Sequence, residues 1–251
     1  MITSGCSFTE SVRENQEKSW ADYLAEKLNK KLVNYGKGGS GNEYIYNSIV
    51  DNLDTDLVVV MWSGFDRWDF HWGSFELPYL IEDGGTMPRK DELVNTSTGK
   101  FENTYVANEN IAELSKVMLK NNLVNRDYQI KKTIRWMVSL QHICEQKNIP
   151  LIQCLGFLDY EWCKKIRFLE FQKSKPSGYH SLSKAFIDYN PFYELENKAL
   201  GWPFSKRIGG FTIMDKLRKD MFVSNFDQHP NYKGHKYISE VFYDEYKKIS
   251  S

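Results

Sequence analysis

Three short segments of this 251-residue chain contain the residue types that acyl transfer needs. "GCSFT" places Ser7 on a turn near the N-terminus, and "FDQHPNYKGH" places Asp227 and His229 near the C-terminus. "NYGKGGSGN" lies between them and is rich in glycine, which allows the backbone to approach a ligand closely. A hydroxyl nucleophile, an imidazole base, a carboxylate that orients it and backbone N–H donors together form a serine hydrolase site. The three segments therefore predict a catalytic triad of Ser7, His229 and Asp227.

Each segment also has a purely structural explanation. Ser7 could cap a helix, because serine is among the preferred N-cap residues. The glycines could form only a tight turn, and Asp227 and His229 could be turn residues completed by Pro230. Three independent structural roles would have to coincide, whereas one catalytic function accounts for all three segments.

The spacing of apolar residues predicts strands that alternate with helices. We expect strands at 1–5, 31–36, 56–62 and 149–157, and helices over 17–29, through Ile45 to Leu53, over 126–147 and after residue 231. The run "DLVVVMW" is typical of a strand buried on both faces. This alternation predicts a parallel, doubly wound sheet, whose ligands bind at the carboxyl ends of the strands. The three segments all lie at predicted strand–helix junctions and should converge at that edge.

Two long segments interrupt the alternation. Residues 64–125 are turn-rich and polar, and residues 158–222 are irregular apart from a helix expected near 159–174. We interpret both as insertions into one domain that covers 1–251.

The order of the segments resembles that of the SGNH/GDSL hydrolase superfamily. Gly5-Cys6-Ser7 matches the first block, with cysteine in place of the usual aspartate, and Gly39 is the best match to the oxyanion-binding glycine of the second. Asp227 and His229 match the last block, which precedes a C-terminal helix. The resemblance implies a flavodoxin-like three-layer α/β/α sandwich and a Ser-His-Asp esterase that uses neither metal nor cofactor. It also implies that the Ser7 and Gly39 amides bind the oxyanion.

Two departures from the family pattern bear on activity. The third block normally contains an asparagine that donates to the oxyanion, but the corresponding segment "WSGFDRW" (62–68) has none. Loss of one such donor costs roughly 3 kcal/mol of transition-state stabilisation, and Ser63 is our candidate replacement. Asp227 also precedes His229 by two positions instead of three. A weak or inactive binding or structural protein of the same fold, and an acyltransferase, therefore remain alternatives.

The residues after the third predicted strand suggest a substrate class. We expect Trp62, Trp68, Trp72 and His71 to lie close to the mouth of the site, and Trp62, Arg67 and Trp68 are our candidates for substrate binding. Aromatic rings stack on sugars, so an O-acetylated carbohydrate is the first substrate class, although these tryptophans could instead pack the insertion onto the sheet. Arg67 could bind a substrate carboxylate, or it could pair with Asp66 or Asp69.

Composition limits the other partners. The chain has 33 basic and 33 acidic residues, and this balance argues against nucleic acid, which needs a basic surface. Its four cysteines lack the spacing of a zinc site and are expected to be free thiols. We find no signal-peptide pattern and no apolar stretch long enough to cross a membrane. We therefore expect a soluble cytoplasmic protein without membrane contact; the pattern leaves open its association with a larger particle and its oligomeric state.

Overall fold

A computed structural model of the chain describes residues 1–10, 18–65, 67–70, 73–76, 94–95, 126–158, 185–225 and 227–250. Its main sheet consists of β1 (Ile2–Gly5), β2 (Val33–Asn34), β3 (Val58–Trp62) and β7 (Leu151–Leu155). All neighbouring strands are parallel, in the order β2-β1-β3-β7. This is the flavodoxin-like order, in which the chain reverses direction across the sheet beside the first strand. The predicted α/β fold is confirmed.

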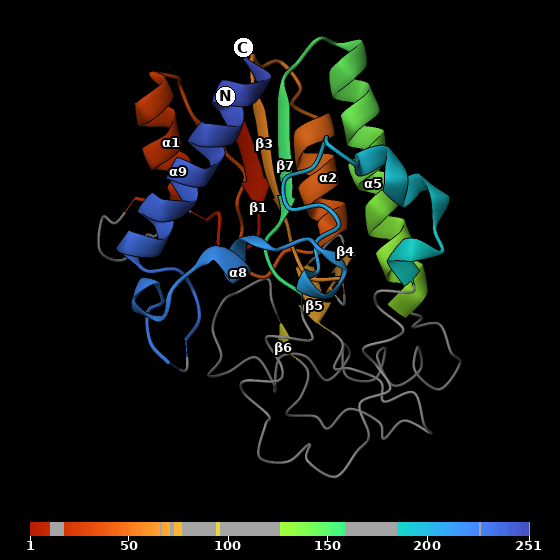
Figure 1. The fold of residues 1–251 in the computed structure, drawn as a ribbon. Helices are drawn as coiled ribbons and strands as arrows, with labels where there is room; N and C mark the ends of the chain where they lie inside the picture. Colours follow the sequence, from red (N-terminus) through yellow and green to blue (C-terminus); the bar gives the residue numbers. More distant parts are fainter. Residues whose placement is uncertain are drawn as a thin grey trace.

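Helices cover both faces of this sheet. In Figure 1, α1 (Trp20–Leu28) and α9 (Tyr232–Ile249) lie on one side of the strands, and α2 (Asn42–Val50) and α5 (Arg126–Gln146) lie on the other. Each of these helices falls within or close to a range predicted from the sequence. Among the described residues, no helix is long and apolar enough to cross a membrane.

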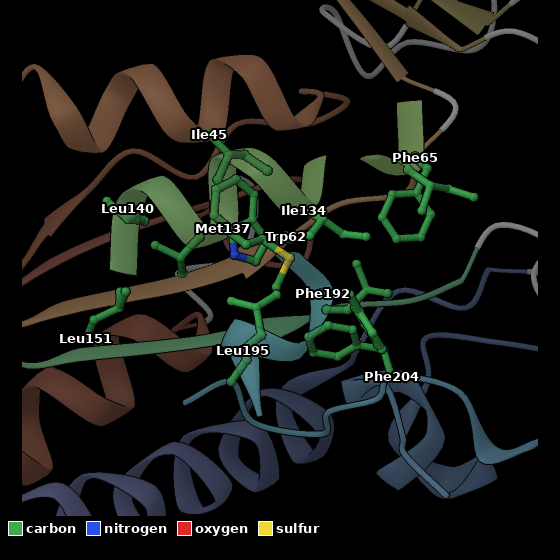
Figure 2. Close-up of a cluster of buried hydrophobic side chains, with 14 of the residues drawn as sticks. Ile45, Trp62, Phe65, Ile134, Met137, Leu140, Leu151, Phe192, Leu195 and Phe204 are labelled. Atoms are coloured by element: carbon green, nitrogen blue, oxygen red, sulfur yellow. The ribbon is translucent and has the colours of Figure 1, made fainter. Parts of the chain in front are cut away.

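The alternation of side chains along β3 divides the core into two clusters. Val58, Val60 and Trp62 pack against α2 and α5, as Figure 2 shows for Trp62. Val59 and Met61 point to the opposite face and pack against α1 and α9. All five residues of β3 are completely buried, as the continuous apolar run predicted.

The described part of the second predicted insertion completes the main sheet and its core. Leu200 forms a parallel bridge with Cys154, next to β7, and so occupies the place of a fifth strand. Phe186, Phe192 and Phe204 are buried in the α2–α5 cluster. The short helices of this segment are η3 (Asn190–Leu195), η4 (Lys206–Ile208), α8 (Ile213–Lys216) and η5 (Lys219–Met221). The expected helix near 159–174 lies outside the described residues.

The described part of the first predicted insertion forms a second sheet. Its strands are β4 (Arg67–Phe70), β5 (Gly73–Glu76) and β6 (Val94–Asn95), paired in antiparallel fashion in that order. Figure 1 shows β4 and β5 beyond the carboxyl ends of the main strands. The remainder of 64–125 lies outside the described residues.

A buried histidine joins the first and last helices. His235, in the first turn of α9, is 3% exposed, and its Nδ1 accepts a hydrogen bond from the backbone N–H of Trp20 at 3.2 Å. This N–H is one of the donors that α1 leaves unsatisfied at its N-terminus. Burial, and secondarily the nearby His229, lowers the pKa of His235 to about 4.

We expect this histidine to make the fold sensitive to acid. Above pH 6.5 the imidazole is neutral in both folded and unfolded chains, whereas between 6.5 and 4 only the unfolded chain binds the proton. The free energy of unfolding should therefore fall by about 2 kcal/mol between pH 7.5 and pH 5 through this group. Urea denaturation should show a smaller acid loss in His235→Gln than in the wild type, with exposed His142→Gln as control. An identical acid loss in His235→Gln would contradict the assignment.

Candidate active site

Ser7 lies on a tight turn directly after β1. The Cys6 carbonyl accepts hydrogen bonds from the backbone N–H groups of Thr9 (2.8 Å) and Glu10 (3.1 Å). A Cβ atom on Gly5 would lie 2.1 Å from Thr9 Oγ1, so the turn can close only because residue 5 is glycine. The turn leaves Ser7 half-buried at the carboxyl edge of the main sheet.

Asp227 and His229 lie on a hairpin that leads into α9. The backbone N–H of Val223 donates to the His229 carbonyl, and that of Ser224 donates to the Asp227 carbonyl, each at 2.9 Å. Asn231 closes the base of the hairpin, because its Nδ2 donates to the Phe222 carbonyl while its Oδ1 caps the first turn of α9. The hairpin thus fixes both side chains relative to a rigid helix.

The structure brings the three predicted triad residues into one hydrogen-bonded chain. Ser7 Oγ lies 2.8 Å from His229 Nε2, and His229 Nδ1 lies 2.6 Å from Asp227 Oδ1. The same Oδ1 accepts the backbone N–H of His229 at 3.0 Å, a contact that aspartate commonly makes two residues along the chain. This local turn allows the carboxylate to reach the ring across a spacing of only two residues.

The glycine loop, residues 36–41, lies beside the end of β1. Gly39 has a φ of +77°, a left-handed conformation that favours glycine. The backbone N–H of Lys37 (3.1 Å) and the Ser40 hydroxyl (3.2 Å) both donate to the Gly5 carbonyl, two residues before Ser7. No acceptor among the described residues engages the backbone N–H of Ser7 or of Gly39. Both groups are therefore available as donors at this edge.

Ser63 follows β3 and is completely buried. Its backbone N–H donates to Asn42 Oδ1 at 2.7 Å, whereas its hydroxyl has no hydrogen-bond partner within the described part of the chain. Continued alternation from β3 directs this hydroxyl to the Met61 side of the sheet, the side on which Phe8 packs. The hydroxyl of Ser63, and not its amide, is thus the group left without a hydrogen-bond partner among the described residues at this edge.

Asn42 fixes the end of β3. The sequence patterns did not identify it as a residue of the site. Its Nδ2 donates to the carbonyls of Ser63 (3.1 Å) and Gly64 (3.2 Å) and to Thr133 Oγ1 (3.1 Å). It therefore joins α2, β3 and α5 at the site edge. The sequence feature that could have identified Asn42 is its position, directly after the glycine loop and at the start of helix α2.

The prediction that Trp62 contacts substrate is wrong. Trp62 is completely buried between the sheet and the α2–α5 layer, where Figure 2 shows its ring beside Met137 and Ile45. Its Nε1 donates to Gln153 Oε1 at 3.0 Å, which satisfies the indole inside the core. Trp68 lies in β4 opposite Phe75, but its side chain is outside the described structure.

Aromatic rings connect the imidazole to Arg67. The Phe8 ring meets the His229 ring edge-on with centroids 5.4 Å apart, and Phe8 packs against Phe157 at 5.3 Å. The Arg67 guanidinium carbon lies 5.4 Å from the centroid of Phe157, at cation–π distance. Arg67 is therefore linked to the His229 ring through Phe157 and Phe8.

A distant similarity to a solved structure is found by comparison with known proteins. No protein-family model matches the chain, and no curated protein matches it. A solved structure from Desulfitobacterium hafniense DCB-2, of a protein provisionally assigned to the lipolytic G-D-S-L family, is 14% identical. The match covers 95% of each chain with a TM-score of 0.41. The fold assignment rests on the strand order given above and not on this similarity.

Proposed function

We propose that the protein is a serine esterase or deacylase that cleaves a carboxylic ester through an acyl-enzyme. The observation that carries this proposal is the chain of two short contacts, 2.8 Å and 2.6 Å, from Ser7 Oγ through His229 to Asp227. A hydroxyl, an imidazole and a carboxylate in this order define a nucleophile, a general base and an orienting group.

The proposed reaction proceeds in two halves. His229 Nε2 takes the hydroxyl proton as Ser7 Oγ attacks the ester carbon, and it then returns that proton to the departing alcohol. Water then enters, gives a proton to the same nitrogen and attacks the acyl carbon. The bond from this carbon to Ser7 Oγ breaks, His229 returns the proton to Oγ, and the carboxylic acid leaves. Asp227 accepts a hydrogen bond from Nδ1–H throughout, so that Nε2 faces the serine as an acceptor and the transient imidazolium is stabilised.

The oxyanion site that we propose combines two amides and one hydroxyl. The backbone N–H groups of Ser7 and Gly39 have no acceptor among the described residues, and neither does the buried Ser63 hydroxyl. A preorganised donor that waits for the developing negative charge costs no rearrangement at the moment of reaction. Ser63 would thereby take the place of the third-block asparagine.

Ser63→Ala should lower kcat for p-nitrophenyl acetate by about 10²-fold, the usual effect of removing one oxyanion donor. Ser4→Ala provides the matched control, because Ser4 is also completely buried in the sheet but its hydroxyl bonds Ser48 of α2. Ser4→Ala should lose the stability that its hydrogen bond supplies, and Ser63→Ala should lose little, because its hydroxyl has no partner among the described residues. Only Ser63→Ala should lose catalysis. Equal activity of the two variants would exclude Ser63 from the oxyanion site.

The proposed substrate class is broader than the one that the sequence suggested. The proposal of an O-acetylated carbohydrate relied on an aromatic rim that included Trp62, and Trp62 is in the core. We therefore propose a carboxylic ester, of which acetylated sugars are one example.

Turnover of p-nitrophenyl acetate tests this function. We expect a burst of p-nitrophenol approaching one equivalent, followed by slower steady turnover, because acylation of Ser7 precedes hydrolysis of the acyl-enzyme. A folded protein that releases no p-nitrophenol above the Ser7→Ala background would favour the alternative, a binding protein on the same fold. The missing third-block asparagine is the observation that supports that alternative.

A further inference from the structure

Two side chains of β4 hold opposite sides of one peptide unit in the glycine loop. Arg67 Nη1 donates to the Ser40 carbonyl at 3.2 Å, and the backbone N–H of Gly41 donates to Asp69 Oδ1 at 2.7 Å. The carbonyl and the N–H belong to the same peptide, which joins Ser40 to Gly41. Arg67 and Asp69 are two residues apart in a strand and so point to the same face. Together they fix the orientation of this peptide plane.

Asp69 also caps helix α2 from a distant part of the chain. Its Oδ2 accepts the backbone N–H of Tyr44 at 2.9 Å, within the first turn of the helix. The N-cap residue, Gly41, has no side chain to do this, and a Cβ atom there would lie 2.6 Å from Asp69 Oδ2. A carboxylate at a helix N-terminus satisfies free donors and interacts favourably with the helix dipole. The glycine loop is therefore held against β4 by charge-assisted bonds.

The Arg67–Asp69 pair is adjacent to the groups of the proposed active site. The Ser40–Gly41 peptide, which Arg67 and Asp69 hold, directly follows Gly39. The Ser40 hydroxyl also donates to the Gly5 carbonyl. Arg67 itself lies over Phe157, whose other neighbour, Phe8, contacts the His229 ring. A shift of β4 would therefore reach the backbone N–H of Gly39 through Ser40 alone.

We propose that Arg67 and Asp69 are positioning residues that fix the Gly39 amide for the oxyanion; this inference rests on the proposed esterase function. A glycine-rich loop has unusual conformational freedom, and a displacement of about 1 Å can cost about 10²-fold in rate. Because the third-block asparagine is missing, stabilisation of the oxyanion depends heavily on the backbone donors. The pair compensates for this loss by holding the loop, and Arg67 thereby has a role other than binding a substrate carboxylate.

Kinetics of Asp69→Ala and Arg67→Gln test the proposal. Each variant should lower kcat for p-nitrophenyl acetate by about 10- to 100-fold, with KM changed less than about twofold and the acid limb of the pH profile unmoved. Asp69→Asn, which keeps an acceptor for the Gly41 N–H, should recover much of the rate. Glu43→Ala is the matched control, since Glu43 is in the first turn of the same helix but pairs with Lys132.

Amide hydrogen exchange supplies a readout that does not require activity. Exchange at residues 38–44 should become faster in Asp69→Ala and Arg67→Gln, and should remain unchanged in Glu43→Ala. Unchanged exchange in both β4 variants would overturn the proposal, and so would an increase in KM with kcat preserved, which would make Arg67 a substrate contact. A wild-type protein without esterase activity would overturn the proposed function separately. Exchange alone would then decide whether the pair holds the loop.

Discussion

Ser7→Ala should abolish the burst of p-nitrophenol and lower kcat by up to roughly 10⁶-fold, the loss that follows removal of the nucleophile in a serine protease. The reason is that the Ser7 hydroxyl lies in hydrogen-bond contact with His229 Nε2, at 2.8 Å, and is the proposed nucleophile. Stopped-flow absorbance gives the burst and the steady rate in one experiment.

Ser250→Ala is the control for this substitution. Ser250 follows the last turn of α9 and is exposed, so its replacement should leave both phases unchanged. A Ser7→Ala protein that keeps its burst would exclude Ser7 as the nucleophile, whereas a protein that loses both its melting transition and its burst would report only unfolding. The melting temperature of each variant therefore accompanies the kinetics.

Asp227→Asn should lower kcat by roughly 10⁴-fold, as the equivalent change does in a serine protease triad. Asparagine can still accept the backbone N–H of His229 through its Oδ1, so the hairpin and its register should persist. The amide cannot stabilise the imidazolium, and its NH₂ group favours the wrong tautomer of the ring. Comparison of kcat with the wild type at neutral pH measures the effect.

Asp220→Asn is a nearby control for this change. Asp220 lies at the base of the same hairpin but pairs with Arg218, and its replacement should alter kcat only slightly. Similar small losses in the two variants would mean that Asp227 merely supports the turn.

The sequence predicted the framework of the site because the framework depends on local patterns. Apolar runs and helical spacing indicate each element of the main sheet, and the direction of parallel strands places their carboxyl ends together. These patterns therefore predict that Ser7 and His229, which are 222 residues apart, lie close together. The parallel sheet agrees with the predicted fold class, and Ser7 Oγ lies 2.8 Å from His229 Nε2 in the structure.

The features that the sequence did not reveal depend on contacts between distant segments. Asp69 caps a helix that begins 27 residues earlier, and nothing in the "RWDF" strand indicates this partner. The burial of Trp62 depends on Gln153, a polar residue inside an apolar strand that satisfies the indole. Each case requires two segments to be placed in three dimensions, and a one-dimensional pattern contains no such information.

Labelling with a fluorophosphonate probe tests the catalytic assignment most directly, because only a serine hydroxyl activated by an adjacent base reacts rapidly with it. We expect one equivalent of label on the wild-type protein, located at Ser7 by peptide mass spectrometry. Labelling should be absent from Ser7→Ala, strongly slowed in His229→Ala and unchanged in His142→Ala, whose histidine is on the surface and pairs with Glu194. A folded wild-type protein that takes up no label, or that takes it up at another residue, would contradict the account.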